Sequence, residues 1–422
     1  MKVLFVANRI PIPCTAGNRA RILSLIRALA GWGHEIHYAF ADPRDIPAAD
    51  SAELETYLGG GKYHWIKTRE GLELDSTFAR GWRKFLRVMK HEAGYRVPLD
   101  HGYDPHTTDY LRRLQDRHQF DVVFIEYVFM SKAAEAFPAE TLRVLDTHDA
   151  FGDRHKAFLT AGQQPSWYST SLREEETGFR RADIILAIQE EEAERFRRRL
   201  GADGSRVHAV SHIIDLSHRI HLSDAPAAAF LGSVNAVNLS ALDFLIREVV
   251  PRVRERRPDF KLLVAGTISK DVERTDAVEP CGIVANLADL FARAPISLNP
   301  MLLGTGVSIK LLDAMACGVP TVSTEIGARG LAPRFRRGML TVPDNDADAF
   351  ASAIQHLVAD RNLRRSLGEM AFADAVAWND QQNRALSDII AIRPKPAAAP
   401  LEATPEMAKP AVDSGTVSGL PV

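Results

Sequence analysis

The feature that most constrains the fold of this chain is an alternation of short apolar runs with longer amphipathic stretches, which occurs twice. In the first half, apolar runs predict strands at residues 3–7, 35–40, 121–125, 143–146, 184–188 and 207–210. The stretches between them predict helices at 17–29, 168–181 and 190–200. Strands that are apolar throughout, separated by helices, indicate a parallel sheet covered on both faces.

The same pattern begins again in the second half. Strands are predicted at 229–231, 261–265, 296–299 and 321–323, and helices at 239–256 and 309–316. A polar stretch without clear periodicity, 215–228, separates the two halves. We therefore predict an α/β protein with one Rossmann-like, doubly wound domain at 1–212 and a second at 213–375. A last helix at 380–392, N-capped by Asn379 or Asp380, is predicted within a segment, 376–393, that completes the first domain.

Composition narrows the class of protein. A chain of 422 residues is too long for one ordinary core, and a net charge of −2 argues against nucleic-acid binding. Cys14, Cys281 and Cys317 fit neither a disulfide framework nor a zinc knuckle, so a cytoplasmic location is expected. Residues 394–422 are rich in Pro and Ala, and we expect them to form a disordered tail.

A glycine loop lies between a predicted strand and a predicted helix in the second half, where the sequence reads Gly304-Thr-Gly-Val-Ser. Gly304 and Gly306 let the backbone turn sharply and approach a ligand closely. Thr305 or Ser308 is predicted to cap the helix. A helix start of this kind attracts phosphate through its free N–H groups and its dipole.

Two charged residues follow on the predicted helix. Lys310 lies one turn in and supplies a cation suited to a diphosphate. Asp313, three residues later on the same face, can accept hydrogen bonds from ribose hydroxyls or can simply pair with Lys310. Gly318 is predicted to end the helix as the C′ residue, with Pro320 just beyond.

Residues 304–324, followed by Gly327-Ala-Arg-Gly, resemble the donor-site signature of retaining glycosyltransferases of family 4 and their near relatives. The pattern of that family is a Gly-rich loop, a Lys, the run Leu-Leu-Glu-Ala-Met-Ala-x-Gly-x-Pro and a Gly-x-x-Gly. The resemblance extends from residue 1 to about residue 392 and is strongest at 229–331. It implies the GT-B architecture, in which two Rossmann-like domains face a central cleft and the C-terminal domain holds a nucleotide-sugar.

The resemblance also implies which residues line the site. On the C-terminal side they are Gly232, Ser233, Asn238, Gly282, Ile283, Val284, Thr305, Gly306, Val307, Ser308 and Asp313, with residues 282–284 contacting the base. On the N-terminal side, Gly17, Asn18 and Arg19 would face the donor diphosphate, although Gly17 also reads as an ordinary helix cap. His148, after a predicted strand, matches a His beside the transferred sugar; the alternative is a structural or solvated His.

Two departures from the family pattern affect the donor site. Thr305 occupies the position of the first of two acids, which leaves the identity of the sugar open, and Asp313 stands at the second. Residues 232–238 lack the usual cations, so Lys310 is expected to carry much of the leaving-group stabilisation as a catalytic residue.

The implied reaction is transfer of a sugar from a nucleoside-diphosphate sugar to an acceptor hydroxyl, with retention, in glycan or polysaccharide biosynthesis. The resemblance implies no cofactor and no metal, because helix termini and side-chain cations stabilise the departing phosphate. The acceptor is a glycan, a lipid-linked or a small molecule, and no nucleic acid is expected. Residues 80–90 are basic with interleaved apolar residues, typical of a peripheral membrane contact or of a solvated helix.

Three alternatives remain at this point. A sugar-nucleotide epimerase shares the architecture but needs acid and base groups that the sequence does not reveal. A nicotinamide dehydrogenase is disfavoured because residues 8–13 replace the Gly-x-Gly-x-x-Gly turn. A non-catalytic nucleotide- or sugar-binding homologue is compatible with Thr305 and the missing cations.

Overall fold

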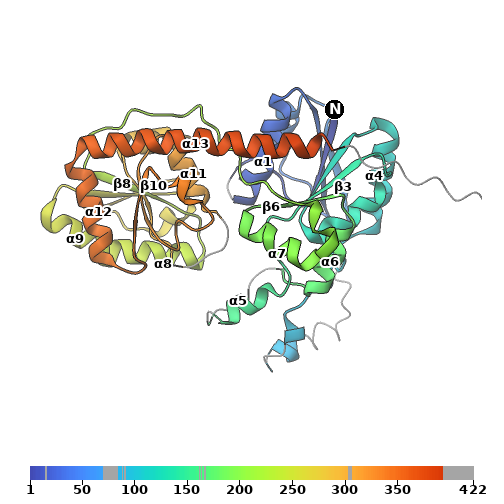
Figure 1. The fold of residues 1–422 in the computed structure, drawn as a ribbon, viewed down its shortest axis with the longest axis horizontal. Helices are drawn as coiled ribbons and strands as arrows, with labels where there is room; N and C mark the ends of the chain where they lie inside the picture. The colour runs from blue at the N-terminus through green and yellow to red at the C-terminus, as the bar shows by residue number, and fades with distance from the viewer. Residues whose placement is uncertain are drawn as a thin grey trace, which may run out of the picture.

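The computed structural model describes residues 1–14, 17–69, 84–87, 89, 92–160, 162, 164–165, 168–302 and 307–392. Within these ranges the chain forms two parallel sheets with helices on both faces (Figure 1). The predicted doubly wound α/β fold is therefore confirmed. The predicted tail lies outside the described residues, and so does most of the basic segment 80–90, whose contact with a membrane stays a prediction. No helix of the described residues is both long enough and apolar enough to cross a bilayer.

The first sheet has seven strands in the order β3-β2-β1-β4-β5-β6-β7, all parallel. Their bounds are β1 Lys2–Ala7, β2 Glu35–Asp42, β3 Tyr63–Lys67, β4 Val122–Glu126, β5 Leu142–Asp146, β6 Ile184–Ala187 and β7 Val207–Ala209. The edge strand β3 has no predicted counterpart, because its sequence, Tyr-His-Trp-Ile-Lys, mixes polar and aromatic residues.

The second sheet repeats this winding with six parallel strands in the order β10-β9-β8-β11-β12-β13. Their bounds are β8 Ala227–Leu231, β9 Lys261–Ala265, β10 Val278–Gly282, β11 Ser297–Asn299, β12 Thr321–Thr324 and β13 Met339–Val342. In both sheets the strand order reverses beside the first strand, between β1 and β4 and between β8 and β11. Ligands of doubly wound sheets bind outside the carboxyl ends of the strands at such a switch point.

Helices cover both faces of each sheet. In the first half these are α1 Gly17–Gly31, α2 Ala48–Leu58, α4 Pro105–His118, α5 Arg154–Thr160, α6 Leu172–Arg180 and α7 Glu190–Leu200, with 3-10 helices η1 Glu92–Gly94, η2 Val128–Ala136 and η3 Gly201–Arg206. One core packs the sheet against α1 and α2, and the other packs it against α4, η2, α6 and α7. The predicted helix 168–181 begins later, at Leu172, because Ser171 caps it by accepting from the Glu174 N–H.

The second half carries α8 Ala236–Phe244, the π-helix η4 Leu245–Val249, α9 Val250–Arg256, η5 Thr267–Asp271, α10 Leu287–Arg293, α11 Ile309–Ala316, η6 Pro333–Phe335, α12 Ala347–Ala359 and α13 Arg361–Ile390. Helices α8, α9 and α12 share a core with one face of the sheet, whereas α10 and α11 cover the other. The π-helix joins α8 to α9, so the stretch predicted as one helix at 239–256 is helical throughout.

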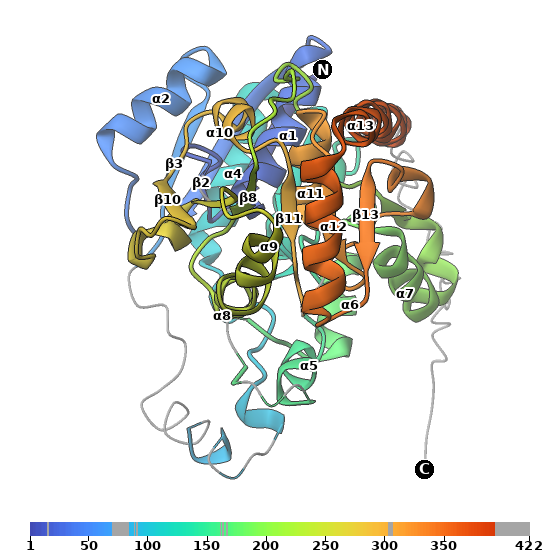
Figure 2. The same cartoon turned by 90° about the vertical axis from the view of Figure 1, so that its left-hand side faces the viewer.

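Helix α13 corrects the prediction for the end of the chain. It begins at Arg361, with Asp360 as its N-cap accepting from Leu363 N–H, and not at 380 with Asn379 or Asp380 as cap. Figure 1 shows it running along both halves of the molecule, and Figure 2 shows it nearly end-on. Its middle turns pack on the second half through Ala371, Ala375 and Trp378, and its last turns place Leu386 and Ile389 in the core of the first.

The same helix holds the connection between the halves. Trp378 Nε1 donates to the His212 carbonyl oxygen at 2.7 Å, and Asn379 exchanges two hydrogen bonds with the backbone of Ile214. Gln382 accepts from the Ser211 N–H at 2.8 Å. The strand connection after β7 is therefore fixed against α13 rather than free to swing.

Candidate functional site

A cavity of about 550 Å³ lies between the two halves, at the carboxyl end of β8. Residues from both halves line it, namely Cys14, Gly17, Ala20, Leu231, Gly232, Ser233, Asn238, Gly266, Thr267, Ile283, Val284, Ala285, Leu287, Val307, Ser308, Ile309, Lys310 and Asp313. Ten of the sixteen site residues predicted from the sequence line this cavity, and they come from α1, from α8, from α11 and the residues just before it, and from the loops after β8 and β10. We refer to it below as the cleft cavity.

The two helices that begin at the cleft cavity come from different halves. A Cβ placed on Gly17, the first residue of α1, would lie 3.0 Å from Cδ1 of Ile309, the first residue of α11. Both helices lie on the sides of the two halves that face each other (Figure 1). The N-terminal ends of α1 and α11 therefore meet at the cavity, and both offer the positive end of a helix dipole to a bound anion.

A close backbone contact shapes the wall of the cavity formed by the loops after β8 and β9. Gly266 has a left-handed φ of 93°, and a Cβ there would lie 2.3 Å from the carbonyl oxygen of Gly232. Only glycine fits this position. The contact brings the two loops together beside Asn238. The Asn238 Nδ2 donates to the Ser233 carbonyl oxygen at 2.8 Å.

The start of α11 matches the prediction in part. Ser308 is its N-cap residue, but the side chain makes no capping bond and donates instead to Asn299 Oδ1 at 3.3 Å. Gly318 has φ 70° and follows the last helical turn, as predicted for a C′ glycine. Gly304, Thr305 and Gly306 lie outside the described residues, so their predicted roles stay predictions.

Lys310 points across the cavity wall toward β8 and α8. Its Nζ donates to Asn238 Oδ1 at 2.7 Å and lies 5.1 Å from the centre of the Phe230 ring. Burial lowers its pKa to about 8. Lys310 thus brings a cation to the first strand and loop of the second half, the region in which the sequence itself offers none.

Asp313 lies one turn further along α11, also on the cavity. Within the described part of the chain it forms no ion pair with Lys310, whose Nζ donates to Asn238 instead, so the simple pairing considered from the sequence is wrong. Burial raises its pKa to about 7. A second cavity, of about 610 Å³, begins at Asp313 and extends between α1, the connection 212–216 and α13.

His148 lies in the first half, after β5, and does not line the cleft cavity. Its Nε2 lies 2.5 Å from Oε2 of Glu126, and its ring stacks on Tyr127 with centroids 4.0 Å apart. The Tyr127 hydroxyl accepts from Asn18 Nδ2 at 2.8 Å. A chain of contacts therefore connects the start of α1, one wall of the cleft cavity, to His148.

Strained backbone marks the same place. Tyr127 and His148, directly after or near the carboxyl ends of β4 and β5, have φ of 73° and 60°. Non-glycine residues in such conformations cost about 1–3 kcal/mol each and concentrate at functional sites. The aromatic stack and the hydrogen bond to Glu126 hold both residues in place.

A buried ion pair lies beneath this cluster and was not predicted. Arg21 Nε and Nη2 donate to the two carboxylate oxygens of Asp146 at 2.8 and 3.0 Å, and both side chains are at most 1% exposed. Burial by itself would raise the pKa of Asp146, but the charge of the Arg21 guanidinium outweighs this effect, and the pKa lies below its usual value. Burial, together with the charge of Asp146, raises the pKa of Glu126.

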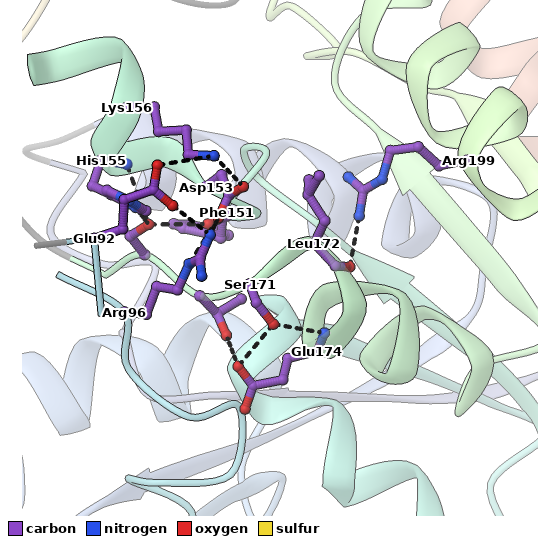
Figure 3. A network of polar contacts seen from close by, with 12 residues as sticks. Glu92, Arg96, Phe151, Asp153, His155, Lys156, Ser171, Leu172, Glu174 and Arg199 are labelled. Carbon is purple, nitrogen blue, oxygen red and sulfur yellow. Dashed lines mark hydrogen bonds and ion pairs between the residues drawn. The ribbon is translucent and has the colours of Figure 1, made fainter. Parts of the chain in front are cut away.

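A polar network fixes the loop that follows His148 (Figure 3). Glu175 accepts from the Phe151 and Gly152 N–H groups at 2.5 and 2.9 Å. Asp153 accepts from Arg96, and His155 Nδ1 lies 2.9 Å from Ser169 Oγ. These contacts hold the loop and the start of α5 to Glu175 of α6, to Arg96 just after η1 and to Ser169.

A further cavity, of about 450 Å³, opens at the carboxyl ends of β1 and β2 in the first half. It is lined by the polar side chains of Asn8, Asp42 and Thr68 and by the aromatic rings of Phe129 and Tyr168. Phe129 stacks on Tyr127 with centroids 4.9 Å apart. The cavity therefore lies behind the ring on which His148 stacks, and we call it the first-half cavity.

The structure brings together some predicted residues and separates others. Gly17, Gly232, Ser233, Asn238, Ile283, Val284, Val307, Ser308, Lys310 and Asp313 line the cleft cavity. Gly282 directly precedes Ile283 and has φ 72°. Arg19 does not line the cavity; its Nη1 donates to the Pro13 carbonyl at 3.1 Å. Glu126, Arg21 and Tyr127 were missed, and the only sequence signals were a carboxylate closing an apolar strand and an Arg on an apolar helix face.

Two groups of side chains in the described residues place three possible metal ligands within 4.8 Å of one another. Glu126, Asp146 and His148 form the first, but the Arg21 guanidinium already occupies both oxygens of Asp146. His37, His64 and His118 form the second, which lies away from the cleft cavity.

Two family models match the chain. The model described as Glycosyltransferase Family 4 matches residues 17–218, and the model described as Glycosyl transferases group 1 matches residues 225–360. The first match includes every strand of the first sheet except β1, and the second includes all six strands of the second sheet.

Curated relatives agree with these models. A protein of the cps region of Klebsiella pneumoniae, described as uncharacterized, is 30% identical over 400 residues, covering 88% of this chain and 94% of the relative. A D-inositol 3-phosphate glycosyltransferase of Catenulispora acidiphila is 26% identical, covering 50% of this chain. The matched part spans only 58% of the length of that relative. A further relative, an exopolysaccharide phosphotransferase of Streptomyces coelicolor, is matched over only 10% of its length.

The fold also resembles solved structures over nearly its whole length. The Anabaena protein HepE in complex with UDP superposes with a TM-score of 0.59 at 15% identity, covering 92% of this chain and 100% of the other. A sucrose-phosphate synthase from Thermosynechococcus elongatus gives 0.61 at 16% identity, covering 92% and 98%.

Proposed function

Because the chain belongs to the GT-B glycosyltransferases, with a family 4 first half and a group 1 second half, we propose that it transfers a sugar from a nucleoside-diphosphate sugar to an acceptor hydroxyl. The observation that carries the proposal is the cleft cavity, where two helix starts and Lys310 converge. Such an arrangement suits a diphosphate, because N–H groups, helix dipoles and a cation all favour negative charge there.

In the proposed reaction the bond between the sugar and the diphosphate breaks, and charge builds on the departing phosphate. Lys310 and the N–H groups at the starts of α1 and α11 stabilise this charge without a metal ion. Asp313 accepts a hydrogen bond from a ribose hydroxyl, and residues 282–284 contact the base. Retention of stereochemistry belongs to the proposal and rests on family membership.

On the acceptor side, His148 is proposed to lie beside the transferred sugar, oriented by Glu126. The first-half cavity is the proposed entry for the acceptor, since it combines aromatic rings with polar side chains, as sugar-binding surfaces require. A glycan or polysaccharide precursor is the proposed acceptor class. Two relatives support it by description, one from a cps region and one an exopolysaccharide phosphotransferase.

The test is thermal unfolding of the purified chain with a panel of nucleoside diphosphates. A ligand that binds only the folded state raises the melting temperature by mass action. We expect UDP or GDP, and not both equally, to stabilise the protein, and this shift to shrink in Lys310→Ala and Asp313→Ala. HepE was solved with UDP, which favours UDP as the first ligand to try.

A matched control for these variants is Lys261→Ala. Lys261 begins β9 at the amino end of the second sheet, is exposed and does not line the cleft cavity. It should keep the full nucleotide-induced shift. Folded protein that no nucleoside diphosphate stabilises would overturn the proposed donor site.

The shifted pKa values of Lys310 and Asp313, both on α11, predict the pH dependence of turnover. Since kcat/KM reports the free enzyme, its value for the donor should fall above pH 8, where Lys310 loses its proton. On the acid side, kcat/KM should rise as the pH increases through 7, because Asp313 becomes a carboxylate there. In Lys310→Arg the fall should move well above pH 8, because Arg stays charged. An unchanged alkaline limb in that variant would show that another group is responsible.

A further inference from the structure

Three histidines from separate segments meet on the first sheet, on the face that α4 covers. His37 is the third residue of β2, His64 the second of β3 and His118 the last of α4. Residues near the starts of parallel strands lie at the amino ends of the strands, opposite the carboxyl ends at which ligands of such sheets bind. The trio is therefore on the far side of the first sheet from the cleft cavity, and the proposed reaction does not use it.

The ring nitrogens of the trio approach one another closely. His37 Nδ1 lies 3.0 Å from His64 Nε2, and one ligand atom from each of the three rings falls within 4.8 Å of the others. Two nitrogens bound to the same tetrahedral zinc ion, at about 2.0–2.1 Å each, are about 3.3 Å apart. The spacing of His37 and His64 is close to this value, and His118 completes a three-histidine set.

A carboxylate orients the most buried member. His37 is 2% exposed, and its second ring nitrogen, Nε2, lies 2.9 Å from Oε1 of Glu35. Histidines that bind metals commonly use their other nitrogen in this way, which fixes the tautomer and directs the free nitrogen at the ion. The other nitrogen of His37, Nδ1, is hydrogen-bonded to His64 Nε2, and a bound ion would replace this contact.

The ring of His118 packs against the other two, with centroids 4.7 Å from that of His37 and 5.5 Å from that of His64. Among the described residues, neither ring nitrogen of His118 has a hydrogen-bond partner, so this ring can turn toward an ion.

We propose that His37, His64 and His118 form a binding site for one divalent transition-metal ion, of which Zn²⁺ is the best match to three imidazole ligands. The ion joins β2, β3 and the C-terminal end of α4, and so has a structural role separate from catalysis. This leaves the prediction of metal-independent transfer at the cleft untouched.

The experiment is titration of tag-free, chelator-treated protein with zinc chloride at pH 7.5, followed by calorimetry and by thermal unfolding. We expect one zinc ion per chain and a rise in melting temperature. The double variant His64→Ala/His118→Ala should weaken binding by at least about 100-fold, while circular dichroism shows it folded. Glu35→Gln keeps all three ligands and should weaken binding about 10-fold to 100-fold.

His106→Ala is the matched control, because His106 is exposed at the opposite end of the same helix, α4. It should bind zinc as the unaltered chain does. Absence of zinc binding by the unaltered chain would overturn the proposal and leave the trio as a stacked, hydrogen-bonded cluster. Binding that persists in the double variant would also overturn it, by placing the ion elsewhere.

Discussion

Replacing Lys310 with Ala should lower kcat for sugar transfer by about 100-fold to 1,000-fold, the loss typical of removing one group that stabilises transition-state charge. The effect should fall mainly on kcat, because Lys310 acts on charge that develops as the donor bond breaks. Its Nζ is anchored by Asn238 and Phe230 at the loop after β8, where the described residues offer no second cation to the cleft cavity. Initial-rate kinetics with the matching nucleotide-sugar would measure it.

Lys310→Arg and Lys261→Ala bracket this result. The first keeps the charge but not the compact shape, so it should retain part of the activity, and the second should retain all of it. If Lys310→Ala turned over donor at the full rate, the leaving group would be stabilised by other groups and the assignment of Lys310 would be wrong.

Replacing Arg21 with Met should destabilise the protein by about 3–5 kcal/mol, since it leaves the Asp146 carboxylate buried without its partner. The Asp146 side chain is inaccessible to solvent, and the Arg21 guanidinium donates one hydrogen bond to each of its two carboxylate oxygens. Urea unfolding followed by circular dichroism would give the difference in unfolding free energy. The pKa of Asp146 lies below its usual value while Arg21 is present, so at neutral pH the variant must bury a charge or bind a proton.

Two further variants separate the effect of losing the ion pair from that of replacing an arginine of α1. Arg27→Met alters another arginine of α1, whose side chain is 52% exposed and 3.8 Å from Asp215, and should cost less than about 1 kcal/mol. Arg21→Met/Asp146→Leu removes both charges and should recover most of the lost stability. A cost for Arg21→Met no larger than that for Arg27→Met would contradict the role of the pair.

The fold was predictable because each strand and its covering helix carry their pattern locally. The apolar run before Gly304 and the helical run after Lys310 needed no information from elsewhere in the chain. Three of the four edge strands, β3, β10 and β13, were not predicted, since an edge strand is buried on fewer sides and its sequence is more often mixed. The predicted start of helix α13 was too late in the chain, because exposed polar residues in its early turns hide the helical periodicity of its apolar residues.

The candidate site divides in the same way. Lys310, Asp313 and Gly17 were found because each belongs to a short motif at a helix start. Glu126, Arg21 and the histidine trio depend on segments far apart in the chain, as with Arg21 and Asp146, which are 125 positions apart. Nothing in a local pattern indicates that such residues meet, so only the packed sheet reveals them.

The course of α13 has a consequence for how the chain is made. Leu386 and Ile389 belong to the core of the half that leaves the ribosome first, yet they are translated after the whole second half. The nascent N-terminal half can form its sheet early, but its core stays open until the last helix is released. The two halves should then unfold in one cooperative transition, and the N-terminal half expressed alone should aggregate unless a peptide carrying the end of α13 is supplied.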